Sequence, residues 1–116
     1  MDKPRTETLL LLLILFTASC LYLSSLNNPF IWDDNHLIIS ENNIRTFACI
    51  PEIFTTHLCH NIGASNFYRP IQSLSFMIDY AAWKLNPFGY HLTNLLLHLI
   101  NIILTYLLVK KVLKNS

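Results

Sequence analysis

Charged residues are scarce in this sequence. They make up 13% of the 116 residues, whereas hydrophobic residues make up 53%. Because a soluble domain carries about 25% charged residues, the composition excludes an ordinary soluble domain and is typical of a membrane protein. The net charge is only +1, and no basic patch is longer than Lys110–Lys114. No nucleic-acid partner is expected, since it would require a clustered basic surface.

Cysteines are also few, and the three present are too few to define a disulfide framework. Cys49 and Cys59 could pair, and the alternative is that both are small buried residues. His57, Cys59 and His60 cluster, but they lack the second half-site that zinc sites usually show. We therefore expect neither a metal site nor a cofactor, with a divalent metal left as the alternative.

Two long apolar runs account for much of the chain. Leu9–Leu26 and Leu92–Val109 each hold 18 residues without a formal charge. At about 1.5 Å per residue each forms about 27 Å of helix, close to the roughly 30 Å hydrocarbon core of a bilayer. The sequence therefore predicts an all-α membrane protein with two transmembrane helices, 9–26 and 92–109. A cleaved signal peptide is the alternative for the first run, but its extension through Leu21–Leu23 favours an uncleaved anchor.

The charges predict how the chain is oriented in the membrane. Lysine and arginine near helix ends prefer the cytoplasmic side. They occur in both tails, 1–8 and 110–116: Lys3, Arg5, Lys110, Lys111 and Lys114. We expect an integral two-pass protein with both termini cytoplasmic and residues 27–91 in an exoplasmic loop. A bacterial plasma membrane is favoured, with the endoplasmic reticulum as the alternative.

Within the loop, helix signals surround an acidic segment. Phe30–Ile39 is expected to be irregular or extended, and a short helix is expected near Pro51. An amphipathic helix over about 70–85 begins at Pro70, since proline is tolerated in the first turn. Such a helix just before a spanning segment is expected to lie in the membrane interface. Its apolar residues fall on one face: Ile71, Leu74, Ile78, Ala81, Ala82 and Leu85.

The second spanning run carries a narrow polar stripe. Its members recur at spacings of three and four residues: His91, Asn94, His98, Asn101 and Thr105. Polar groups in hydrocarbon need hydrogen-bonding partners, and the first run has polar residues mostly near its outer end. We interpret the stripe as a helix-packing surface for further transmembrane helices, with pairing to a second copy of the chain as the alternative.

The acidic pair Asp33-Asp34 is the strongest candidate for chemistry. It follows the first spanning run at the membrane surface, after Phe30-Ile31-Trp32. One carboxylate can act as a base while the other orients a hydroxyl, although such a pair is often only a solvated turn. Arg69 could bind a phosphate bidentately, and the alternative is that it pairs with Asp33, Asp34 or Asp79.

Four motifs follow one another along the chain: Phe30–Asp34 (FIWDD), Tyr68–Pro70 (YRP), Leu85–Asn94 (LNPFGYHLTN) and His98. In this order they resemble the start of GT-C type multi-spanning membrane glycosyltransferases. The resemblance is closest to the protein O-mannosyltransferase-like branch, whose members often carry C-terminal tetratricopeptide repeats. It extends from about Leu9 to Leu113, and the YRP and NPFGYH elements together are fairly specific.

The resemblance implies a function. Enzymes of this type transfer a sugar, with inversion, from a polyprenyl-phosphate donor to an acceptor hydroxyl on the exoplasmic face. Their first exoplasmic loop carries the catalytic acid, which by this match is Asp33 as general base, supported by Asp34. Substrate binding by Arg69, Tyr68 and His36 is a chemical hypothesis added to the resemblance.

The sequence also departs from that family, because its members have many more spanning helices than two. We therefore expect this chain to be the first part of a longer enzyme and inactive alone, which agrees with the unpartnered polar stripe. The alternative is a small non-enzymatic membrane protein that binds a partner through its loop and stripe.

Overall fold

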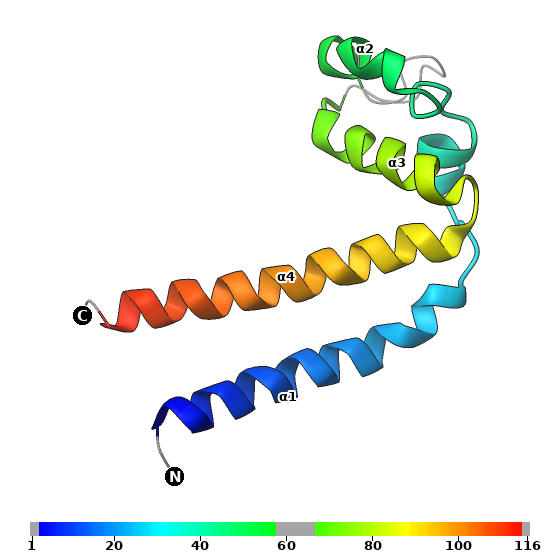
Figure 1. Cartoon of the computed structure of the whole chain (residues 1–116). Coiled ribbons are helices and arrows are strands. Elements are labelled where there is room, and N and C mark those ends of the chain that lie inside the picture. Colours follow the sequence, from blue (N-terminus) through cyan, green and yellow to red (C-terminus); the bar gives the residue numbers. More distant parts are fainter. Residues whose placement is uncertain (1–2, 58–66, 115–116) are drawn as a thin grey trace. The chain divides into compact units, whose positions relative to one another are not determined.

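The computed structural model describes residues 3–57 and 67–114, and the regular elements in these ranges are all helices (Figure 1). The long helices are α1 (Lys3–Leu23) and α4 (Pro87–Lys114), and the shorter ones are α2 (Ile50–Thr55) and α3 (Pro70–Trp83). The chain divides into two compact units. We call residues 1–26 with 91–116 the helix-pair unit, and residues 27–90 the loop unit.

Both helices of the helix-pair unit are long and apolar enough to cross a membrane, over Arg5–Asn27 and Pro87–Lys114. Only 6% of the apolar window in each is buried, whereas a core helix of a soluble domain would be mostly covered. Side chains exposed in this way are stable only in an apolar surrounding, which a bilayer provides. The all-α membrane fold predicted from the sequence is confirmed, with helices that begin earlier than the apolar runs themselves.

Hydroxyl groups in α1 are satisfied within their own helix. The Thr17 hydroxyl donates to the Leu13 carbonyl and the Ser19 hydroxyl donates to the Leu15 carbonyl, both at 2.8 Å. After Leu23 the chain tightens into a 3-10 turn, Ser24–Asn27. The hydroxyl-to-carbonyl bonds of Thr17 and Ser19 let these residues stay in hydrocarbon without partners on another helix. Thr17 and Ser19 are therefore not available as donors to the stripe on α4.

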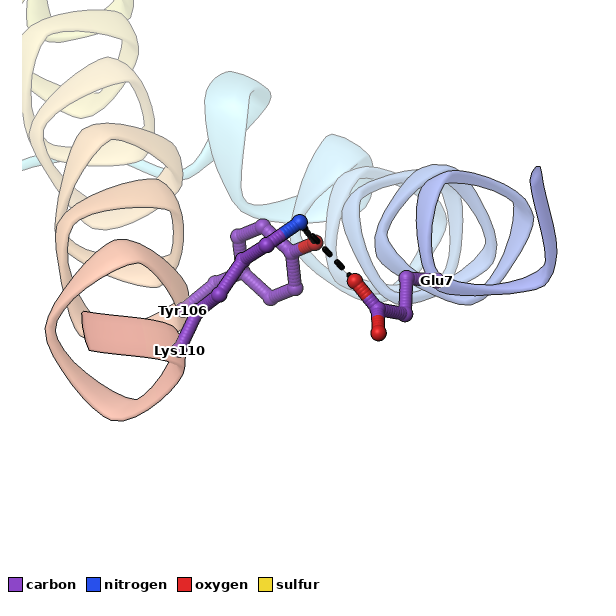
Figure 2. A network of polar contacts seen from close by, with 3 residues as sticks. All are labelled: Glu7, Tyr106 and Lys110. Atoms are coloured by element: carbon purple, nitrogen blue, oxygen red, sulfur yellow. Dashed lines mark hydrogen bonds and ion pairs between the residues drawn. The ribbon is translucent and has the colours of Figure 1, made fainter. Parts of the chain in front are cut away.

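A charged contact joins α1 to α4 near the chain termini (Figure 2). The Lys110 Nζ lies 2.8 Å from the Glu7 Oε2 and donates to the Tyr106 hydroxyl at 3.3 Å. The same ammonium group lies 5.6 Å from the centre of the Tyr106 ring. Sequence reasoning counted Lys110 only as a tail charge and overlooked Glu7. The structure extends both helices through these residues, so the charges form an interhelical contact.

This contact predicts the outcome of a charge swap. Glu7→Lys alone is expected to lower the melting temperature of the reconstituted chain slightly, because two cations then face each other. Glu7→Lys combined with Lys110→Glu is expected to restore it, measured by circular dichroism in vesicles at low ionic strength. A double variant that melts at the same temperature as Glu7→Lys alone would contradict the contact. Glu7→Lys combined with Lys114→Glu has the same net charge as the double variant and serves as the control.

The loop unit has its own small hydrophobic core. Its buried members are Ile38, Ile44, Ile53, Met77 and Tyr90. The core forms where α2 and α3 pack against the segment that follows the acidic pair. A 3-10 turn, Phe47–Cys49, leads into α2. Thr46 caps this 3-10 turn, because its hydroxyl accepts from the Ala48 N–H at 3.3 Å. The short helix expected near Pro51 is α2.

Helix α3 has two apolar faces rather than one. Met77 is buried in the core, and Leu74 and Phe76 pack against it. Most of the face predicted from the sequence is exposed instead: Ile71, Ile78, Ala81, Ala82 and Leu85. The reason is that Met77 and the aromatic Phe76, which lie beside the predicted face on the helix, turn toward the core. An apolar face left outside agrees with an interfacial helix.

A sharp break separates α3 from α4. Lys84 has a left-handed backbone with φ 55°, and the Asn86 side chain accepts from the Phe88 N–H at 3.2 Å, which caps α4. The Tyr90 hydroxyl donates to the Lys84 carbonyl at 2.8 Å and so closes the turn. The position of Gly89 leaves no space for a side chain, because an added Cβ would overlap the Trp83 indole.

Gly89→Ala is therefore expected to destabilise the loop unit by about 1–3 kcal/mol, the usual cost of overpacking. The measurement is chemical unfolding of the reconstituted chain, followed by circular dichroism. In a Trp83→Ala background the same substitution is expected to cost almost nothing, because the overlapping ring is gone. Equal costs in both backgrounds would show that the indole is not the obstacle.

Candidate functional site

The acidic pair lies on a tight turn, whereas the sequence predicted an irregular or extended segment with no helical turn in it. The Asp34 N–H donates to the Ile31 carbonyl at 3.0 Å, and the Ile31 N–H donates back to the Asp34 Oδ2 at 3.1 Å. The turn runs directly into a π-helical turn, Asn35–Ile39. The Asp34 side chain closes the turn that precedes this helical segment, through a local contact that apolar patterning around the pair does not reveal.

The two carboxylates have different surroundings. The Asp34 carboxylate is partly buried and holds the turn through the Ile31 N–H. The Asp33 side chain is exposed and makes no hydrogen bond with the described residues, while its backbone carbonyl accepts from the His36 and Leu37 N–H groups at 2.9 and 2.8 Å. Asp33 thus has a fixed backbone and an available carboxylate, which is the arrangement a general base requires.

Arg45 anchors the end of this turn and was not singled out by sequence reasoning. Its Nη2 donates to the Ile38 carbonyl at 3.1 Å and to the Ile39 carbonyl at 2.6 Å. Its guanidinium lies over the Tyr80 ring, 4.4 Å from the centre. A cation at the last carbonyls of a helical turn is favourable. Arg45 therefore connects the acidic segment to α3.

Helix α3 also carries a buried acid, directly before Tyr80 in the sequence. Asp79 is buried, and both Asp79 and Arg45 are near enough to the Tyr90 hydroxyl to act on it electrostatically. Phe30 packs edge-on against the Tyr90 ring, with ring centres 5.2 Å apart. The residues on either side of the acidic pair are thus tied to the loop unit, at Phe30 before it and at Ile38 after it.

Tyr68 and Arg69, two of the predicted substrate-binding residues, lie away from these contacts. The Tyr68 hydroxyl donates to the Phe54 carbonyl at 2.8 Å, which is a packing role. The Arg69 guanidinium lies over the Phe67 ring, 5.0 Å from its centre. None of the described residues forms an ion pair with Arg69, so the alternative pairing with Asp33, Asp34 or Asp79 is not observed.

Arg69 instead borders a small polar cleft together with Glu41, Asn43, His57 and Ser73. Glu41 is buried and its carboxylate accepts from the Asn43 N–H at 3.1 Å, while the Asn43 side chain donates to Glu52 at 3.1 Å. The cleft has a volume of about 20 Å³, which is room for a water molecule. His36, the third predicted substrate-binding residue, is exposed on the π-helical turn just after the acidic pair.

Predictions about the cysteine cluster are only partly covered by the structure. Cys49 has a free thiol, whereas Cys59 and His60 lie outside the described residues. Among the residues that are described, no three His, Cys, Asp or Glu side chains gather closely enough to hold a metal ion. The possible Cys49–Cys59 bond involves a residue outside the described ranges and stays a prediction.

Part of the polar stripe lies along a groove in the helix-pair unit. His98, Asn101 and Thr105 on α4 border an apolar groove of about 570 Å³, opposite Leu10 and Ile14 on α1. The His98 ring meets the Tyr22 ring edge-on, with centres 5.2 Å apart. Tyr22 is thus one partner on α1 for the stripe. The proposed role of the whole stripe, His91 and Asn94 included, in packing against further helices remains a prediction.

Comparison with known proteins gives a consistent set of relatives. The chain is 36% identical to protein O-mannosyl-transferase TMTC2 of Homo sapiens over 87 residues, which is 67% of this chain and 10% of the relative. It is 35% identical to protein O-mannosyl-transferase TMTC1 of Homo sapiens over 109 residues, 88% of this chain and 12% of the relative.

Protein O-mannosyl-transferase F38B6.6 of Caenorhabditis elegans is 29% identical over 115 residues, 95% of this chain and 17% of the relative.

This chain is a protein O-mannosyltransferase-like region.

The O-mannosyltransferase-like region spans only about a tenth of the length of the TMTC2 relative. No family model and no solved structure matches it. The match to the C. elegans relative extends over 95% of the chain, so the acidic turn and Arg45 both lie within it. The resemblance seen in the FIWDD, YRP and NPFGYH motifs is confirmed.

Proposed function

We propose that this region supplies the catalytic base of an inverting GT-C type glycosyltransferase that moves mannose from a polyprenyl-phosphate donor to a hydroxyl group of a protein. The names of the relatives support mannose as the sugar and a protein as the acceptor. The observation that carries the proposal is the difference between the two acids. Asp33 has an exposed carboxylate on a fixed backbone, and Asp34 holds the turn.

In the proposed reaction Asp33 takes the proton of the acceptor hydroxyl. The acceptor oxygen then attacks the anomeric carbon, the bond from that carbon to the phosphate oxygen breaks, and polyprenyl phosphate leaves. One displacement of this kind inverts the configuration, as the single-step geometry requires. Asp34 is a positioning residue, because its contact with the Ile31 N–H fixes the turn that carries Asp33. The exposed His36 is proposed to contact the acceptor.

Arg69 is proposed to bind the donor phosphate. Guanidinium binds phosphate through two parallel hydrogen bonds, and this guanidinium has no ion-pair partner among the described residues. The exposure of the Arg69 side chain supports a role in binding a phosphate that approaches from outside the loop unit. We propose that Tyr68 positions the segment of Arg69 through its bond to the Phe54 carbonyl, and that the transfer uses no bound cofactor.

Residues 27–91 are proposed to face the exoplasmic side and both termini the cytoplasm. The lysines at the end of α4 support this orientation: Lys110, Lys111 and Lys114. The relatives named above are animal proteins. They support the endoplasmic reticulum over the bacterial plasma membrane that the sequence alone favoured.

We propose that these 116 residues do not transfer sugar alone. The groove beside His98, Asn101 and Thr105 is proposed to receive further transmembrane helices of the full-length protein. The stripe would then supply interhelical hydrogen bonds, each worth about 0.6–2 kcal/mol in a membrane. The position of the stripe on an otherwise apolar helix supports this role, because polar groups in hydrocarbon need hydrogen-bonding partners.

The test is a transfer assay with the full-length protein in vesicles. Radiolabelled polyprenyl-phosphate mannose and a protein acceptor are supplied, and alkali-labile label on the acceptor is measured. The expected result is transfer by the full-length protein and none by the 116-residue chain. The proposal would be contradicted if the full-length protein transferred no sugar from polyprenyl-phosphate mannose or from other polyprenyl-phosphate sugars. That result would favour a non-enzymatic membrane protein.

A further inference from the structure

Two neighbouring apolar side chains project from the acidic turn without taking part in the core. Ile31 is 64% exposed and Trp32 is 87% exposed. Phe30, directly before them, packs against Tyr90 and belongs to the core of the loop unit. Among the large apolar side chains of Phe30–Ile39, these two are the most exposed, and Trp32 is the most exposed large hydrophobic residue among those that the structure describes.

The backbone holds this pair in an unusual conformation. Trp32 has φ 50°, in the left-handed region that bulky residues rarely adopt. The turn is fixed on both sides, because the Ile31 N–H donates to the Asp34 carboxylate, and the N–H and side chain of Asn35 donate to the Trp32 carbonyl at 3.2 and 3.3 Å. A strained residue kept in place by its surroundings is typical of a functional segment. Here the strain presents the indole outward.

Chain connectivity keeps this pair close to the membrane surface. The first membrane span, which comprises α1 and the 3-10 turn after it, ends at Asn27. This is five residues before Trp32, and a fully extended chain covers at most about 3.3–3.6 Å per residue. Trp32 therefore lies within about 18 Å of the end of the span, whatever path the chain takes. Tryptophan is enriched at membrane–water interfaces, where its apolar ring and its N–H group are both satisfied.

We propose that Ile31 and Trp32 insert into the headgroup layer of the membrane and anchor the acidic turn there. A lipid surface explains the aliphatic neighbour Ile31 as well as the indole, whereas a sugar-stacking platform would need only the aromatic ring. The anchor fixes the depth of Asp33, because adjacent Cα atoms are 3.8 Å apart. Its carboxylate then stays at the aqueous edge of the headgroup layer. The proposal does not depend on sugar transfer.

The test uses the full 116-residue chain, which has only two tryptophans. Trp83→Phe leaves Trp32 as the only tryptophan, and it is excited at a wavelength that the tyrosines do not absorb. The chain is placed in phosphatidylcholine vesicles whose acyl chains carry bromine, a quencher, at either a shallow or a deep position. We expect emission at shorter wavelength than in water and a greater loss of fluorescence with shallow bromine than with deep bromine. Aqueous acrylamide is expected to quench Trp32 less than it quenches the same chain unfolded in denaturant.

Two results would overturn the proposal. Emission unaffected by bromine at either depth would show that Trp32 is in water and free to stack on a soluble ligand. Stronger loss with deep bromine would place it in the hydrocarbon core. Circular dichroism checks that Trp83→Phe keeps its helices, and if it does not, wild-type emission minus that of Trp32→Phe isolates the Trp32 contribution in a native background.

Discussion

Asparagine in place of Asp33 is expected to lower sugar transfer by the full-length protein about 10²–10⁴-fold, the range that a general base contributes. The substitution removes the proton acceptor but keeps size and shape. The Asp33 side chain makes no hydrogen bond with the described residues, so the turn should keep its fold. The measurement is the initial rate at saturating donor and acceptor, with circular dichroism and membrane insertion as checks of integrity.

Asp34→Asn is the matched control. Its amide oxygen can still accept from the Ile31 N–H, so we expect a much smaller loss of rate than for Asp33→Asn. Asp34→Ala removes that acceptor and is expected to lower both rate and stability, because a displaced turn misplaces Asp33. Undiminished transfer by Asp33→Asn would remove this residue from the mechanism, and equal losses for the two asparagine variants would contradict their different roles.

The large elements of this fold could be predicted from the sequence because they depend on local physics. Two uncharged apolar runs can form only spanning helices in a membrane, and Pro70 and Pro87 each start a helix in the structure. The acidic turn could not be predicted in the same way. Its geometry includes a side-chain contact between Asp34 and Ile31 and a Trp32 with positive φ, and neither has a signature in the apolar pattern.

Long-range contacts explain the other differences. Arg45 carried no signal in the sequence, since its partner Tyr80 lies 35 positions further along the chain. The buried face of α3 was misplaced because its apolar residues surround the helix, and periodicity alone does not choose between two apolar faces. Gly89 lies inside a motif that was recognised, but the reason for a glycine there became clear only once the Trp83 ring was placed against it.

Arg45→Ala is expected to destabilise the loop unit by about 2–4 kcal/mol. The change removes hydrogen bonds from a charged donor to the Ile38 and Ile39 carbonyls, each worth about 1.5–3 kcal/mol when charged, and a contact with the Tyr80 ring worth about 0.5–2 kcal/mol. Partial rehydration of the carbonyls keeps the total below that sum. The measurement is denaturant unfolding of the reconstituted chain, read from its helical circular dichroism.

The controls separate a structural loss from a catalytic one. Among the described residues, the exposed Arg69 guanidinium contacts only the Phe67 ring and no backbone carbonyl. We therefore expect Arg69→Ala to change the stability by no more than about 0.5 kcal/mol. Arg45→Lys keeps the charge but not the planar fork and should fall between wild type and alanine. Because Arg45 holds the end of the turn that carries Asp33, Arg45→Lys should also slow transfer in the full-length protein while leaving the donor KM nearly unchanged. If Arg45→Ala is as stable as the wild type, Arg45 does not stabilise the end of the acidic turn, and Asp34 alone holds that turn.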